Sequence, residues 1–179
     1  SEKVQDNFTL LAGWSCSTLA ERMKNEGRVY FVLWGDFTPT EVSERIGIQP
    51  TESWLKHSRF PERKVPRESI WEYSTEHVIE EVLDIYKLAD QIVSDLHPYR
   101  ERIKEVIEEF QLDATLQIVL YISIDESIST PILGFKKEVI EFLSSVGASI
   151  DIDTYRNSEP VDTDNPGNPP ENSKNQPDD

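Results

Sequence analysis

The sequence has almost no cysteine and no long hydrophobic run. Its one cysteine, Cys16, cannot form a disulfide within the chain and fits a reducing compartment. No apolar run approaches the ~18 residues that a membrane-spanning helix needs. The first ten residues lack the basic and apolar regions of a signal peptide. We therefore expect a cytoplasmic protein that does not insert into a membrane.

Positive charge is also scarce. The chain has 18 Lys and Arg against 34 Asp and Glu, which gives a formal net charge of −16. The last 23 residues hold six acids and one lysine, so their charge of −5 leaves −11 for residues 1–156. Such a surface makes nucleic acid and anionic membranes poor general partners. A basic protein, or a cation, fits the charge better.

Catalytic motifs are missing as well. The seven glycines stand singly, so no glycine-rich phosphate loop is present. His57, His77 and His97 form no metal-binding pair such as HExxH, and Cys16 has no local motif of a nucleophile. The sequence therefore predicts no cofactor and argues against an enzyme that uses cysteine or histidine.

Four segments have the composition and alternation of β-strands. The longest, 112–124, has an apolar residue at every even position, which predicts one fully buried face. In 28–36, one side carries Val29, Phe31 and Leu33, and the other carries Tyr30, Val32 and Trp34. The two remaining strands are predicted over 69–74 and 148–155.

Amphipathic helices are predicted after the first strand, over 76–110 with a break at His97-Pro98, and over 136–146. Thr38 fits the N-cap of the first helix, with Pro39 next and Glu41 in a capping box. Glycine follows the first and last helices, as is common at helix ends. The apolar spacing predicts inward-facing positions that include Ile79, Val82 and Ile140.

Both halves of the chain read strand, helix, glycine, strand. Parallel crossovers of this kind are almost always right-handed, so two of them predict a sheet with helices on one face. Any short amphipathic helix that ends in glycine would give the same pattern without true pseudo-symmetry. We predict a single α+β domain over 28–156, related to ferredoxin-like folds, with a four- or five-stranded mixed sheet. Residues 1–27 are interpreted as an N-terminal appendage, and the acidic, Pro- and Asn-rich residues 157–179 as a disordered tail.

Several local motifs resemble one bacterial family. These are the turn of Gly47, Ile48, Pro50 and Thr51 with Trp54, the strand with Trp71, and the closing IDIDTY of residues 150–155. Over about residues 28–156 the chain resembles the family catalogued as domain of unknown function 4279. In that family, a glycine and a compact loop usually follow the tryptophan, whereas the loop here is basic and lacks glycine. The resemblance implies the fold and a bacterial cytoplasmic setting, and it implies no activity.

The odd positions of 112–124 and 148–155 should share the sheet face that points away from the helices. We call this the second face, and it also receives Tyr30, Val32 and Trp34. An aromatic and acidic sheet face suits binding, because Tyr and Trp offer contact area and a polar group together. The alternatives are that the N-terminal segment or a second copy covers this face, or that it holds a small molecule. The predicted partner-binding residues are Tyr30, Trp34, Gln117, Tyr121, Asp151, Asp153 and Tyr155.

Two charged clusters are further candidates. Asp151 and Asp153 lie on one side of a strand, and Asp36 is a possible third metal ligand, although calcium takes about six to eight oxygens. Solvated or arginine-paired carboxylates explain the pair equally well. The loop 55–68 is the one basic stretch, and it suits an anion or an acidic partner unless it pairs with acids of the chain itself. Its candidate anion-binding residues are Lys56, Arg59, Arg63, Lys64 and Arg67.

These features predict a non-catalytic cytosolic binding protein whose partner is another protein, and a basic protein fits the charge of the chain. Small acidic α+β chains of this kind occur among bacterial immunity and antitoxin proteins, which neutralise basic nucleases by charge and shape. One alternative is a divalent-cation-dependent enzyme or ligand-binding domain that uses Asp36, Asp151 and Asp153. The other alternative is a structural homodimer.

Overall fold

The computed structural model describes residues 24–157. Of the predicted N-terminal appendage only residues 24–27 are described, and of the predicted disordered tail only Asn157; the rest of both lies outside the described residues. The strands are β1 (Asn25–Gly35), β2 (Glu52–Trp54), β3 (Ser69–Ser74), β4 (Val78–Glu80), β5 (Asp113–Ile122) and β6 (Ser149–Arg156). The helices are α3 (Pro39–Ile46), α4 (Ile85–Leu96), α5 (Arg100–Phe110) and α6 (Lys137–Val146), with 3₁₀ turns η1 (Pro61–Arg63) and η2 (His97–Tyr99).

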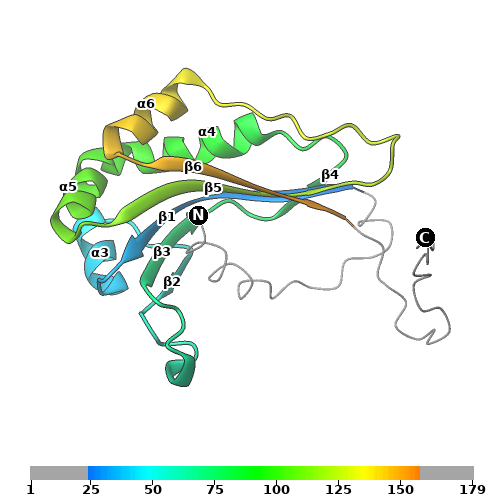
Figure 1. Cartoon of the computed structure of the whole chain (residues 1–179). Helices are drawn as coiled ribbons and strands as arrows, with labels where there is room; N and C mark the ends of the chain where they lie inside the picture. The colour runs from blue at the N-terminus through cyan, green and yellow to red at the C-terminus, as the bar shows by residue number, and fades with distance from the viewer. Residues whose placement is uncertain (1–23, 158–179) are drawn as a thin grey trace, which may run out of the picture.

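The strands form one mixed sheet in the order β2-β3-β1-β5-β6, and β4 pairs with the start of β1. At the centre, β1 runs antiparallel to both β3 and β5, whereas β5 and β6 are parallel. Helices α4, α5 and α6 lie together over one face of this sheet (Figure 1). The predicted α+β fold is therefore confirmed, but the sheet has six strands and not four or five.

The two strand–helix–strand halves are not equivalent. In the second half, β5 and β6 are parallel neighbours joined through α6, as predicted. In the first half, β1 and β2 are also parallel, since both run antiparallel to β3, but β3 lies between them. This arrangement is the split β-α-β unit of ferredoxin-like folds. The pairing partner of β2 is therefore β3, which comes later in the chain.

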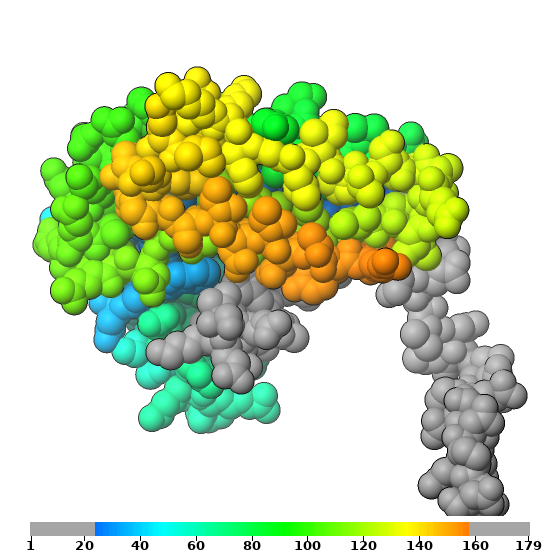
Figure 2. All heavy atoms as spheres, turned by 45° about the horizontal axis from the view of Figure 1, so that its top comes forward, coloured from blue at the N-terminus to red at the C-terminus, as the bar shows by residue number. Residues whose placement is uncertain are grey.

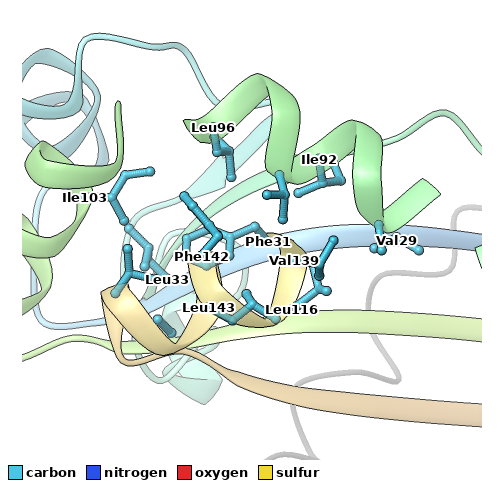
Figure 3. Close-up of a cluster of buried hydrophobic side chains, with 14 of the residues drawn as sticks. Val29, Phe31, Leu33, Ile92, Leu96, Ile103, Leu116, Val139, Phe142 and Leu143 are labelled. Carbon is cyan, nitrogen blue, oxygen red and sulfur yellow. The ribbon is translucent and has the colours of Figure 1, made fainter. Parts of the chain in front are cut away.

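The hydrophobic core lies between the helices and the inner face of the sheet. Alternation in β1 sends Val29, Phe31 and Leu33 to the helix side, and Leu116 and Ile118 of β5 join them. Figure 3 shows side chains of α4 and α6 meeting the strands in this layer. All five strand residues are fully buried. Their burial is what holds the helices on this face.

The helix predicted from residue 76 to the break at His97-Pro98 starts later in the structure than the sequence indicated. Residues 78–80 form β4, in which Ile79 pairs with Glu26 of β1, and the helix starts only at Ile85. Asp84 is its N-cap, and its carboxylate accepts a hydrogen bond from the backbone N–H of Lys87 at 3.4 Å. Val82, predicted to face inward, is 51% exposed. Ile79 belongs to a short strand and Val82 to the segment after it, so their helix-like spacing led to a wrong prediction.

The strand β1 also begins earlier than predicted, at Asn25, which moves the start of the folded part from residue 28. Gly27 permits this, because a β-carbon there would lie 2.9 Å from Leu83 Cδ2 and Leu120 Cδ2. A larger residue would clash at this crossing. The glycine therefore belongs to the strand interior, where close approach of other groups requires it.

The glycines predicted to end the first and last helices do so, whereas the capping box predicted at Thr38 is not formed. Gly47 ends α3 with φ 87°, and Gly147 ends α6 with φ 70°, a region that favours glycine. Thr38 occupies the N-cap of α3, but its side chain makes no cap hydrogen bond, so the expected capping box is absent. Instead, its carbonyl accepts the N–H of Val42 at 3.2 Å.

Three isoleucines that were expected inside are on the surface. Ile150 and Ile152 pair with Leu116 and Ile118 of β5, so they point to the helix side as predicted. They are nevertheless 36% and 39% exposed, because β6 is the edge strand and the helices do not cover it fully. Ile140 of α6 is 47% exposed.

This difference gives a matched test of the core. Ile118 and Ile152 are register neighbours on the same face, but only Ile118 is fully buried. Ile118→Ala should lower the free energy of unfolding by about 2–5 kcal/mol, because it leaves a cavity. Ile152→Ala should cost less than about 1 kcal/mol, since water already reaches that side chain. Urea denaturation of both variants measures the two losses, and equal losses would contradict this description of the edge.

Candidate partner-binding face

The sheet brings all seven predicted partner-binding residues onto the second face. Their positions follow from the strand registers: Tyr30 lies beside Gln117, Gln117 beside Asp151, and Tyr121 beside Tyr155. The structure adds other side chains to this face that the sequence analysis did not select. They are Glu26, Arg28 and Glu72, and they lie beside Val32 and Val119, which were expected there.

The β5–β6 side of the second face is linked by direct contacts. Gln117 Nε2 donates a hydrogen bond to Asp153 Oδ2 at 3.1 Å. The rings of Tyr121 and Tyr155 stack with centroids 5.0 Å apart. Tyr155 is 45% exposed, and Tyr121, Asp151 and Asp153 are half-buried. This side of the face therefore offers aromatic and acidic groups that a partner can reach.

Next to it, toward β3, lies a buried polar cluster formed by Arg28, Tyr30 and Glu72. Arg28 Nη1 and Glu72 Oε1 are 3.2 Å apart, and the Glu72 side chain is only 1% exposed. The Arg28 guanidinium also sits over the Tyr30 ring, 4.6 Å from its centroid, in a cation–π contact. One charged pair is thus held in a layer of otherwise apolar and aromatic side chains.

Burial dominates the electrostatics of this cluster. It raises the pKa of Glu72 from 4.5 to about 7, although the neighbouring Arg28 acts in the opposite direction. Burial also raises the pKa of Tyr30. At the edge of the sheet, burial and the charge of Asp151 raise the pKa of Asp153. Glu72 and Asp153 are therefore easier to protonate than ordinary surface acids.

Three buried polar atoms in this cluster and in the neighbouring Gln117 have no hydrogen-bond partner in the described part of the chain. Arg28 Nε, Glu72 Oε2 and Gln117 Oε1 are buried, and none of them has a hydrogen-bond partner among residues 24–157. A buried polar atom without a partner costs about 1–3 kcal/mol. Such atoms are rare in native structures and call for a physical reason.

The three predicted metal ligands do not come together. Asp36 follows the end of β1, is exposed, and pairs with Lys56, whose Nζ lies 2.7 Å from its Oδ2. Asp151 lies level with Tyr30, far along the strand from Asp36. Within residues 24–157, no group of three or more His, Cys, Asp or Glu is arranged to hold a metal ion.

The basic loop forms a separate arm between β2 and β3. It contains η1 and an antiparallel bridge between Phe60 and Val65, and it projects away from the sheet (Figure 1). Lys56 at its base pairs with Asp36, as the self-pairing alternative anticipates. Arg59, Arg63 and Lys64 are exposed further out, and Arg63 lies 6.0 Å from the Phe60 ring centroid. Arg67 completes the five basic residues of the arm.

Sequence reasoning missed Arg28 and Glu72, although a signal was present. Arg28 lies two residues before Tyr30 and so shares its face, and Glu72 lies between Trp71 and Tyr73, which face the helices. What the sequence did not supply was the register that pairs β1 with β3 and places the two charges side by side. A pairing across 44 residues has no local signature.

The raised pKa of Glu72 gives a test by pH. Its carboxyl is protonated more readily in the folded state, so its stabilising contribution is complete below pH 4.5 and is lost as pH rises through about 7. The free energy of unfolding should therefore fall between pH 4.5 and 8, by on the order of 3 kcal/mol from this group. Glu72→Gln should remove that part of the fall.

Urea denaturation of wild type and Glu72→Gln at several pH values measures this difference. The exposed Glu52, which pairs with Glu72 in the β2–β3 ladder, supplies the control Glu52→Gln. The control should keep most of the wild-type fall, because the charge of Glu52 contributes less than burial to the raised pKa of Glu72. If stability relative to Glu72→Gln instead rose with pH, Glu72 would be an ordinary ion-paired carboxylate.

Comparisons with known proteins give one match. No curated protein and no solved structure is similar to the chain at a significant level. Within residues 24–157, the longest helix has 12 residues, and none is long and apolar enough to cross a membrane. The family model described as "Domain of unknown function" matches residues 25–157, which are nearly the whole described fold. The chain therefore belongs to the DUF4279 family, as its motifs suggested.

Proposed function

We propose that this chain is a non-catalytic, cytosolic bacterial protein that binds another protein, a basic one, through its second face. The observation that supports the proposal is the convergence of acids and aromatic rings there. Glu26, Glu72, Asp151 and Asp153 come from three strands of one sheet, β1, β3 and β6, and they share its face with a single arginine, Arg28. The acidic charge of the chain is thus combined with a defined contact surface.

The exposed part of the second face has the chemistry of a protein-binding surface. Tyr and Trp are enriched at the centres of interfaces because they bury large areas and keep a polar group. Tyr155 is 45% exposed, and Trp34 and Tyr121 are half-buried, so part of each ring stays accessible. The neighbouring aspartates would attract a basic partner over several ångströms and fix its orientation.

The carboxylates that a partner can reach favour the same class of partner. Asp151 and Asp153 are half-buried acceptors, so a partner would meet them by donating N–H groups. The unpaired atoms of Glu72 and Gln117 are buried and lie out of its reach. Lysine and arginine side chains carry three and five such donors and no acceptors. A bacterial immunity or antitoxin protein that neutralises a basic nuclease would fit these requirements.

Reversal of charge on the exposed side of this face tests the proposal. Asp151→Lys/Asp153→Lys should abolish recovery of the partner from lysate of the native host, because both replaced side chains lie on the second face. The matched control is Glu105→Lys/Glu138→Lys, which makes the same change in net charge at exposed helix positions. Quantitative mass spectrometry of the captured proteins gives the readout.

We expect wild type and the helix control to recover the same partners, with basic proteins enriched among them. Both double variants should remain folded and show a thermal unfolding transition, since none of the four positions is fully buried. Equal recovery of every partner by wild type and by Asp151→Lys/Asp153→Lys would remove the second face from consideration.

A further inference from the structure

The outer edge of β6 is a regular strand edge that has no neighbouring strand among residues 24–157. β6 ends the strand order, and its eight residues pair with β5 in an unbroken parallel register from Ser149 to Arg156. Every side chain of β6 is exposed or half-buried. Figure 2 shows β6 as a continuous orange band along the surface beneath α6. Its outward N–H and C=O groups form a template for one more strand.

The two edges of this sheet differ. β2, at the other edge, has only three residues, and a short edge is one of the ways in which natural sheets avoid unwanted pairing. β6 is eight residues long, contains no proline and has no bulge in its register. Protective features of the usual kind are thus missing from β6 along most of its length.

The side chains of β6 alternate in a way that specifies the added strand. Ile150 and Ile152 lie on the helix side and are 36% and 39% exposed, so they form an apolar strip along the edge. Asp151 and Asp153 lie on the second face between them. A strand placed beside β6 would therefore meet isoleucines on one side and carboxylates on the other.

We propose that β6 binds an extended segment of a partner protein as an additional strand, with apolar residues alternating with lysine or arginine. This inference rests on the proposed function and specifies how the basic partner binds. The apolar residues of the segment cover Ile150 and Ile152, and its basic residues reach Asp151 and Asp153. Backbone hydrogen bonds supply affinity, and the alternation supplies the choice of sequence.

A second copy of this chain is a poorer occupant of the edge. A symmetric antiparallel pair of β6 strands centred on Ile152 would set Asp151 opposite Asp153 of the other copy. A pair centred on either aspartate would set that aspartate opposite itself. Like charges directly opposite each other destabilise a sheet. The charge pattern of β6 therefore disfavours self-association in the registers that pair most of the strand, and it favours a basic segment.

Synthetic peptides test this proposal directly. The probe is a ten-residue peptide of alternating valine and lysine with blocked ends, and the control has the same composition in an order without alternation. Binding to the full chain is measured by fluorescence anisotropy, and amide protection of residues 149–156 by NMR hydrogen exchange. We expect the alternating peptide to bind at least about tenfold more tightly than its control, and to protect β6 amides.

Backbone methylation separates strand addition from charge attraction. In an extended strand, the N–H groups of all valines point to one edge and those of all lysines point to the other. One peptide is N-methylated at every valine, another at every lysine and a third at both. The third should lose binding, because a parallel and an antiparallel strand turn opposite edges toward β6 and this peptide has no N–H group on either edge. Whichever of the first two binds more tightly then indicates the direction of the added strand. Attraction by charge alone would treat all three peptides alike.

Charge exchange completes the design. Asp151→Lys/Asp153→Lys should weaken the affinity for the valine–lysine peptide by about tenfold or more. The same variant should gain affinity for a valine–glutamate peptide. Glu105→Lys/Glu138→Lys should behave like wild type. Equal binding of the unmethylated peptide and the peptide methylated at both residues would overturn strand addition, although a basic partner could still bind the second face. Absence of binding to every peptide, with a dimer mass in solution, would assign the edge to a second copy.

Discussion

The antiparallel pairing of β1 with β5 determines which side chains enter the core and which form the second face. Val29 is opposite Ile118, and Phe31 is opposite Leu116, so four large apolar side chains face the helices together. A slip of one residue in either strand would turn its apolar set outward and bury Tyr30 or Gln117 against the helices. The hydrophobic effect on one side therefore fixes the arrangement of polar groups on the other.

The polar groups on that other side do not serve stability well. A buried ion pair such as Arg28 with Glu72 is often less stabilising than apolar residues of similar size. The raised pKa of Glu72 and the unused atoms of Arg28, Glu72 and Gln117 indicate the same cost. Apolar side chains in such a layer are often at least as stabilising, so folding alone does not explain the charges there. Binding is the physical reason that we favour.

Much of this architecture was predictable from sequence because it depends on local periodicity. The alternation in 28–36 and 112–124 predicted both sheet faces, and Gly47 and Gly147 predicted two helix ends. Features that depend on the order of strands were not predictable. The exposure of Ile150 and Ile152 follows from the edge position of β6, and the contact of Arg28 with Glu72 follows from pairing across 44 residues. A three-residue strand such as β4 is also too short for a periodic signal.

The edge position of β6 changes how its sequence should be interpreted. In β5, packing against the helices demands apolar residues at alternate positions, so their presence needs no further explanation. In β6, the same alternation lies largely at the surface. Ile150 and Ile152 bury little area against the core there, and exposed apolar side chains promote association with other chains. Solubility alone would favour polar residues at both positions. Contact with another chain, as proposed above, would give both isoleucines a burial that this fold does not provide.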